Sequence, residues 1–175
     1  TSYGGRDYAV LGFPQKGNGT RADIIGFELA YRQQFDFLPG FLSGLGLEAN
    51  MTLIDSNLKV PGRSAPAAFQ EQSKLLYGGQ IFCQMGPVEP SPAYHHTGRA
   101  LIALGADQLG DQYNDDLRRL DAKISVKLFD NLTLSAEAQN LTDEPTRQYQ
   151  GQRRDWVIQN ERYGRTFYAG ASVRF

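Results

Sequence analysis

The chain has 175 residues, the size of one ordinary domain, and its 18 basic and 19 acidic residues almost cancel. This balance excludes a basic field that would attract nucleic acid, and the single cysteine, Cys83, excludes an internal disulfide or a thiol–metal cluster. The longest apolar stretch compatible with a helix, residues 100–106, falls far short of the about 20 residues that a membrane-spanning helix needs. Half-apolar strands that cross a membrane remain compatible with this composition.

The N-terminal residues resemble no export signal. Thr1 is not a start methionine, and the sequence TSYGGRDYAV has neither a basic n-region nor an apolar h-region. We therefore expect the chain to be part of a longer protein and infer nothing about its compartment from this segment.

The first half predicts four strands. Apolar side chains occupy alternate positions in residues 25–31 and 45–53, with polar or small side chains between them. Successive side chains of a strand point to opposite faces, so this alternation predicts strands. Residues 74–85 and 88–98 alternate more weakly, and the second range contains two prolines that cannot donate to a strand ladder. We predict strands there as well.

The last third has three clearer strands, in residues 119–129, 132–139 and 167–175. Asp130-Asn131 forms a tight turn between the first two. The apolar positions of the first are Leu120, Ala122, Ile124, Val126 and Leu128. The prediction is an all-β, antiparallel chain of about seven strands, and from alternation alone a soluble sandwich or barrel is the alternative to a membrane barrel.

Short and long connections alternate along the chain. The short ones are residues 36–44, 86–87 and 130–131, and the long ones are approximately residues 55–70, 103–116 and 141–163. Tight turns at one end of a sheet and long loops at the other are typical of bacterial outer-membrane barrels, which have short periplasmic turns and long extracellular loops. The last strand then ends on the short-turn side, which is periplasmic in such barrels.

Charge and aromatic side chains favour the membrane interpretation. The predicted lipid-facing positions lack charge, whereas the opposite positions carry Glu28, Arg32, Glu48, Lys123, Lys127, Glu137 and Arg174. Aromatic residues gather at the strand ends, as in the girdles of membrane barrels. They are Phe35, Phe37, Phe41, Phe129 and Phe175 near the short turns, and Tyr163 and Phe167 toward the long loops.

Residues 131–145 (NLTLSAEAQNLTDEP) and 163–175 (YGRTFYAGASVRF) resemble the C-terminus of TonB-dependent receptors. Residues 26–31 (GFELAY) and 38–46 (LPGFLSGLG) resemble an earlier hairpin of that family. The resemblance extends approximately from Ile25 to Phe175. Pro90 and Pro92 depart from the alternating pattern of the family.

The resemblance implies an outer-membrane transmembrane β-barrel of about 22 strands, closed by an N-terminal plug domain. Residues 1–20 would be a loop piece and residues 21–175 the last seven strands and their loops. The plug and its TonB-contacting box would precede this chain. Implied partners are outer-membrane lipid, the TonB complex through the missing plug, and the barrel assembly machinery through the C-terminal strand, with Phe175 as the assembly signal.

The implied function is active uptake of a scarce nutrient, such as siderophore-bound iron, haem, cobalamin or an oligosaccharide. No bond is broken, so the resemblance implies neither enzymatic activity nor a cofactor. A passive porin-like barrel and a soluble β-domain that binds a ligand are the alternatives.

The last long loop contains the candidate substrate-binding residues. Guanidinium groups pair with carboxylates or catecholates, and aromatic rings stack on flat or sugar-like molecules. The candidates are Arg147, Tyr149, Arg153, Arg154 and Trp156. An ordinary solvated loop would also have this composition.

We expect no metal site. Asp111, Asn114, Asp115 and Asp116 provide hard oxygen ligands that suit calcium, but without EF-hand spacing a hydrated acidic loop is favoured. His95 and His96 are adjacent, so on a strand they point to opposite faces and cannot hold one ion together.

Overall fold

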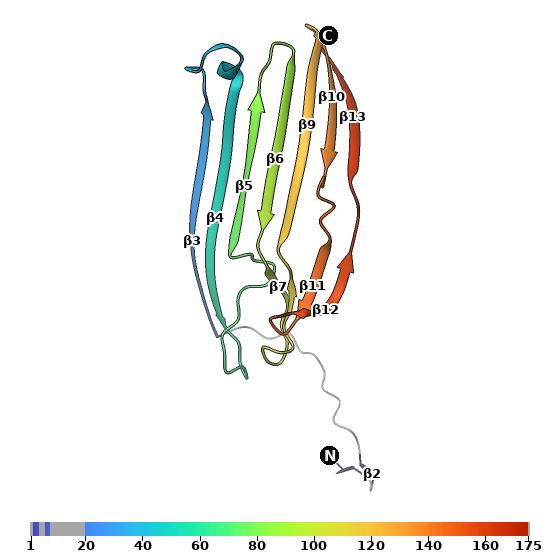
Figure 1. Cartoon of the computed structure of the whole chain (residues 1–175). Coiled ribbons are helices and arrows are strands. Elements are labelled where there is room, and N and C mark those ends of the chain that lie inside the picture. Colours follow the sequence, from blue (N-terminus) through green and yellow to red (C-terminus); the bar gives the residue numbers. More distant parts are fainter. Residues whose placement is uncertain (1, 4–5, 8–19, 175) are drawn as a thin grey trace.

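The computed structural model describes residues 2–3, 6–7 and 20–174. The described residues form an all-β structure with antiparallel strand pairing throughout its sheets. The two-residue strands β1 (Ser2–Tyr3) and β2 (Arg6–Asp7) pair with each other, and the remaining strands form two sheets (Figure 1). No helix in the described part of the chain is long and apolar enough to cross a membrane.

The larger sheet contains the seven predicted strands, which follow one another as neighbours. They are β3 (Arg21–Gln34), β4 (Leu45–Lys59), β5 (Leu75–Cys83), β6 (Val88–Thr97), β9 (Leu117–Phe129), β10 (Leu132–Gln139) and β13 (Thr166–Val173). Each pairs antiparallel with the next, so this large sheet is an uninterrupted meander. The sequence prediction of seven antiparallel strands is confirmed.

The strand β6 tolerates its two prolines because its ladder with β5 does not reach them. Pro90 is opposite Ile124 and Pro92 opposite Ala122 in the ladder with β9. The ladder between β5 and β6 ends at Ala93, so both prolines lie beyond it. Their missing N–H groups therefore interrupt no continuous ladder on the β5 side, and the strand tolerates them.

The connections alternate as predicted, but the long ones are not plain loops. The short connections lie together at one end of the large sheet, and one contains the 3-10 turn η1 (Gly40–Gly44) (Figure 1). At the other end, two long connections contain β7 (Ala100–Ala103), β8 (Gln112–Asn114), β11 (Thr146–Gln150) and β12 (Arg153–Glu161). These four strands form a second sheet in the order β12-β11-β8-β7, here called the small sheet.

The strand register joins the apolar positions of the large sheet into one surface. Phe27 is opposite Leu53, and Leu53 is opposite Leu75. Ile124 is opposite Ala136 farther along the sheet. Directly opposed residues of an antiparallel pair point to the same side, so the alternating apolar residues of the separate strands form one continuous apolar face.

The charged positions form the other face. Arg32 is opposite Glu48, Glu48 is opposite Gln80, and Lys123 is opposite Glu137. The prediction that these charged positions share the side opposite the apolar residues is confirmed, whereas Asp55, near the long connections, is opposite Ile25 on the apolar side. We call the charged side the polar face.

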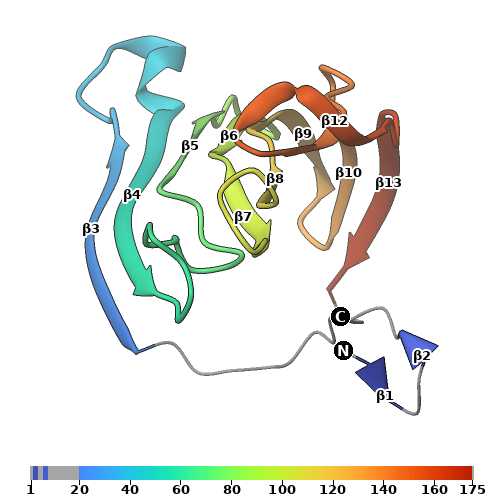
Figure 2. The same cartoon turned by 90° about the horizontal axis from the view of Figure 1, so that it is seen from below.

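The large sheet is curved into an open arc. Seen along the strands, β3 and β13 lie at its two ends, and β7 and β8 lie within it (Figure 2). In the described residues the sheet does not close into a barrel, because neither β3 nor β13 pairs with a second strand. No further layer of described residues covers the apolar face, where Ile25 and Phe27 are 74% and 56% exposed.

The buried residues lie instead around the small sheet. The buried apolar side chains are Ala67, Ala100, Leu101 and Tyr149. The aromatic residues predicted at strand ends are largely exposed, among them Phe37, Phe129, Tyr163 and Phe167. Phe175 lies outside the described residues.

Candidate functional site

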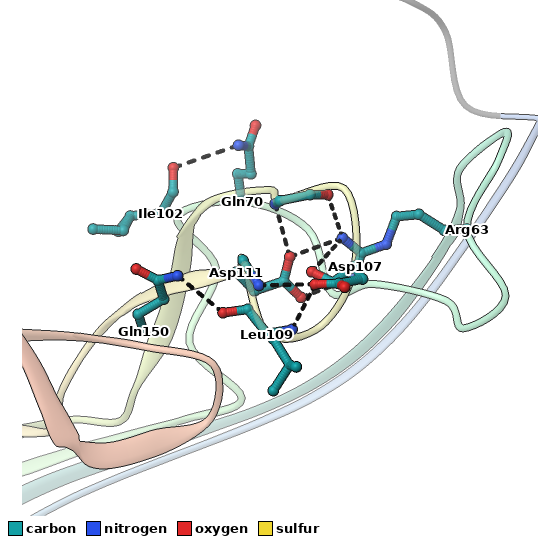
Figure 3. A network of polar contacts seen from close by, with 9 residues as sticks. Arg63, Gln70, Ile102, Asp107, Leu109, Asp111 and Gln150 are labelled. Atoms are coloured by element: carbon teal, nitrogen blue, oxygen red, sulfur yellow. Dashed lines mark hydrogen bonds and ion pairs between the residues drawn. The ribbon is translucent and has the colours of Figure 1, made fainter.

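A buried ion pair joins two long connections under the small sheet (Figure 3). Arg63 Nη1 and Nη2 donate to Asp111 Oδ1 and Oδ2 at 2.8 and 2.9 Å, and the two side chains are only 4% and 3% exposed. Two parallel charge-assisted bonds fix both distance and orientation. The hydrogen bond to Asp111 raises the pKa of Arg63, so the guanidinium stays charged.

Backbone groups of Gly105 form hydrogen bonds with both side chains of this ion pair. Asp111 Oδ1 also accepts from the N–H of Gly105 at 2.9 Å, and Arg63 Nη1 donates to the carbonyl of Gly105 at 2.6 Å. Nearby, Gln70 donates to the carbonyl of Ile102 and Gln150 to that of Leu109 (Figure 3). The network ties the connection between β4 and β5 to the small sheet.

A second charged cluster lies where β9 begins. Arg154 contacts Asp115 at 3.2 Å and Asp116 at 2.8 Å, and Arg147 contacts Asp115 at 3.7 Å. Burial alone would raise the pKa of Asp116, but hydrogen bonds from Arg154 and from the N–H of Arg99 lower it overall. The acidic residues at the start of β9 are thus already paired with arginines.

Two tyrosines form the centre of the small sheet. Tyr113 of β8 and Tyr149 of β11 stack with ring centroids 5.4 Å apart, and the guanidinium of Arg99 lies 5.7 Å from the Tyr113 centroid. Burial, followed by the charge of Asp111, raises the pKa of Tyr113. The Tyr113 phenol is therefore neutral at physiological pH, and its ring packs against the ring of Tyr149.

A cavity of about 510 Å³ lies between the small sheet and the ends of the large-sheet strands. It is lined from six different elements or connections by Asn57, Gln72, His96, Leu101, Tyr113 and Arg154, among others. Gln72 Oε1 and His96 Nδ1 are buried in this lining without a hydrogen-bond partner. Polar and apolar side chains from both sheets converge on this cavity, which makes it the candidate binding site.

The structure separates the five predicted binding residues. Arg154 lines the 510 Å³ cavity, and Arg147 lines a neighbouring cavity of about 310 Å³. Tyr149 is 0% exposed, so its ring packs inside the small sheet and has no surface open to a ligand. Arg153 and Trp156 lie together on the exposed strand β12, with the guanidinium 4.5 Å from the indole centroid. The binding role of these residues stays a prediction.

The acidic residues of this region do not form a hydrated loop, because they pair with other side chains and Asp111 is buried. Asp111, Asp115 and Asp116 are bound to arginines, and Asn114 Oδ1 accepts from Gln148 at 3.0 Å. His95 and His96 are opposite Gly78 and Tyr77 in the β5–β6 ladder, which places them on opposite faces. Residues 2–3, 6–7 and 20–174 contain no group of three or more acidic, histidine or cysteine ligands arranged for a metal ion.

Sequence reasoning missed the small sheet, the Arg63–Asp111 pair and Gln72. The strands β7, β8 and β11 have four, three and five residues, too few to show a period. Arg63 and Asp111 are 48 positions apart, so no local pattern joins them. The run of acidic residues after position 110 was the only signal in this region.

Comparison of the chain with protein-family models, with curated proteins and with solved structures gives no match. The resemblance to TonB-dependent receptors therefore stays a prediction from the residues that carry it.

Proposed function

We propose that this chain is a section of an outer-membrane β-barrel, the C-terminal section of a TonB-dependent receptor that imports a scarce nutrient. The apolar face of the large sheet carries this proposal. It crosses seven strands, and its side chains are exposed to about half or more on β3, where Ile25, Phe27, Leu29 and Tyr31 follow one another. Soluble proteins rarely leave so continuous an apolar surface in water, whereas lipid would cover it without cost.

The two faces of the large sheet support a wall between lipid and water. Uncharged side chains such as Phe27 and Leu53 occupy the apolar face except near the long connections, where Asp55 is opposite Ile25, and ion-forming residues such as Arg32, Glu48 and Lys123 occupy the other face. A soluble sandwich would bury one face against a second layer of strands. The curved sheet, with polar residues opposite the apolar face, has the character of a barrel wall around a hydrated lumen.

Strand length and edges support a larger barrel. β3, β4 and β9 have 14, 15 and 13 residues, and a tilted strand needs about 9–11 residues to cross a bilayer. Among the described residues, neither edge strand of the large sheet, β3 or β13, pairs with a further strand. Open edges do not persist in a hydrocarbon layer, so further strands would have to close the sheet.

The uptake part of the proposal rests on the resemblance of residues 131–145 and 163–175 to TonB-dependent receptors. The small sheet would then lie on the extracellular side, because the long connections contain it. Its cavity would be open to ligands that arrive from outside.

The experiment is to express the chain with an export signal, isolate the membranes, and measure extraction by urea, dependence on detergent and heat-modifiable migration. We expect the protein to sediment with outer membranes, or to aggregate without detergent, because the apolar face has no protein cover. A monodisperse, β-rich protein in plain buffer would contradict the proposal and favour a soluble ligand-binding domain.

Active and passive transport are separated in cells that produce the full-length protein. Uptake that stops when the proton gradient is collapsed would support the TonB-dependent function. Uptake that continues unchanged would favour a passive porin-like barrel.

A further inference from the structure

We propose that a groove on the apolar face of the large sheet binds an anionic lipid of the surrounding membrane, with an acyl chain in the groove and the phosphate at Arg118 and Arg165. The groove has a volume of about 370 Å³ and crosses β6, β9, β10 and β13, which lie side by side (Figure 1). The inference rests on the proposed function for the lipid that covers this face, and it adds which lipid is held and where.

The strand register shows that the groove opens on the apolar face. Its lining includes two rows of apolar residues that are opposite one another across the strands, Pro92–Ala122–Ala138–Phe167 and Pro90–Ile124–Ala136. The row between them contains Lys123 and Glu137, whose side chains point to the polar face. That middle row therefore contributes its backbone to the floor of the groove.

The side chains of the groove suit a hydrocarbon chain. The alanines are short, whereas Ile124 and Phe167 project from the sheet and are 42% and 69% exposed. None of the side chains in the two apolar rows has a hydrogen-bonding group, so they cannot orient a polar molecule. An acyl chain needs no such group, because it fills an irregular apolar surface through dispersion contacts.

Two arginines lie beyond one end of the groove, toward the long connections. Arg118 is four positions before Ala122 on β9, so the two residues share a face of the sheet. Arg165 directly precedes β13, and its Nε donates to the carbonyl of Leu141 at 2.9 Å. The N–H of Leu141 in turn donates to the carbonyl of Leu120 at 2.8 Å, which holds the Arg165 guanidinium close to β9.

The charges of these arginines are open to an anion. Arg118 and Arg165 are exposed, and neither forms a salt bridge within residues 2–3, 6–7 and 20–174. Arginine binds phosphate oxygens through charge-assisted hydrogen bonds, so the pair complements a lipid phosphate. A zwitterionic lipid would bring its own cation to the same place.

Aromatic rings set the depth of the arginines in the membrane. Arg118 is opposite His96, whose ring stacks on that of Tyr77 at 4.6 Å, and the Tyr94 ring lies 6.1 Å from Tyr77. Tyrosine rings gather at the headgroup level of membrane proteins, where lipid phosphates also lie. Four residues of a strand extend about 13 Å, so a chain attached to a phosphate at Arg118 reaches the groove.

The test is native mass spectrometry on the full chain in a non-ionic detergent. The chain is incubated with equal amounts of dioleoyl phosphatidylglycerol, which is anionic, and dioleoyl phosphatidylcholine, which is zwitterionic. We expect it to retain phosphatidylglycerol at least threefold more than phosphatidylcholine. Equal retention of the two lipids would overturn the proposal.

Neighbouring arginines on opposite faces separate a site from general charge attraction. Arg118→Gln should at least halve the preference for phosphatidylglycerol, its combination with Arg165→Gln should abolish it, and Arg118→Lys should keep most of it. Arg119→Gln is the matched control, because Arg119 is exposed and opposite His95 on the polar face. Equal losses in Arg118→Gln and Arg119→Gln would overturn the proposal.

A second pair of variants tests the groove itself. Ala136→Leu fills the groove and should lower retention of phosphatidylglycerol at least twofold. Ala49→Leu is the control, because Ala49 is opposite Tyr31 on the apolar face of β4, outside the groove. If Ala136→Leu does not fold, as heat-modifiable migration would show, the smaller change Ala138→Val decides. Unchanged retention in the folded groove variant would overturn the proposal.

The lipid site and the proposed function fail in different ways. A chain that requires detergent but retains both lipids equally would keep the membrane function and lose the lipid site. A chain that is monodisperse in plain buffer would contradict the membrane function, and the lipid site with it.

Discussion

The two sheets of this protein have opposite relations to solvent. The large sheet is long and regular, yet many of the apolar side chains on one of its faces are exposed. The small sheet has short strands, but the buried side chains of the described residues gather in and around it. Ala67, Ser73, His96, Ala100, Leu101, Asp111, Asn140 and Tyr149 are 9% exposed or less.

The difference indicates what stabilises each part. The small sheet has its own core, a buried ion pair and stacked rings, so its order depends on contacts within the described chain. In the described residues the large sheet has backbone ladders but no protein layer on its apolar face, which the proposed lipid contact would cover and stabilise. Substitutions in the two sheets should therefore respond differently to detergent or lipid.

The largest effect is expected from Asp111→Ala in the small sheet. The substitution leaves the guanidinium of Arg63 buried without its partner, which costs about 3–5 kcal/mol for a pair of this kind. Hydrogen exchange of β7, β8 and β11 should accelerate strongly, while β9 and β10 keep their protection. Asp23→Ala is the control, because Asp23 pairs with Arg21 in the open and its loss should be undetectable. Equal exchange in both variants would show that the pair does not hold the small sheet.

The next effect distinguishes the two faces of the large sheet. Ile124→Arg places a charge on the apolar face, and in a bilayer this costs about 2–4 kcal/mol near the midplane. Ser125→Arg is the matched control on the polar face, where it should be tolerated. The measurement is the fraction of folded, heat-modifiable protein in lipid vesicles against urea concentration. Equal urea midpoints for the two variants would argue against a lipid-facing surface.

A smaller effect is expected when acid protonates the Asp116 carboxylate at the start of β9. The folded-state pKa of Asp116 lies below its ordinary value, so the carboxylate stabilises the small sheet fully above a pH of about 4. That contribution is lost as the pH falls through the depressed folded pKa. Protection of β8 against hydrogen exchange, corrected for intrinsic rates, should fall in this range. Asp116→Asn should remove this part of the pH dependence, and an unchanged pH profile would contradict the assignment.

The sequence predicted the large sheet because its physical requirement is local. Each strand separates an apolar side from a polar side, so the period of two is visible within every segment, even in β6 with its prolines. The small sheet depends on residues brought together from distant segments. Arg63 meets Asp111, and Tyr149 meets Tyr113, without any shared local pattern.

The residues of the candidate site were also hard to predict, because their roles depend on contacts between distant segments. The sequence placed Tyr149 and Arg154 in one loop with the right chemistry for a ligand, but burial decides their roles. Tyr149 is enclosed in the small sheet, whereas Arg154 lines the cavity. Gln72 gave no signal, since a single glutamine between two predicted strands is distinctive only when its oxygen is found buried and unpaired.

The smallest effect is expected from Arg153→Ala on the exposed strand β12. Arg153 pairs with Asp155 at 2.7 Å and lies over the Trp156 ring, but all three groups are open to solvent, where such contacts contribute little. Stability should be unchanged within error, while the fluorescence of Trp156, the only tryptophan, should shift as the cation leaves its ring. A loss of stability comparable to that of Asp111→Ala would show that these exposed contacts, and not only the buried pair, hold the small sheet together.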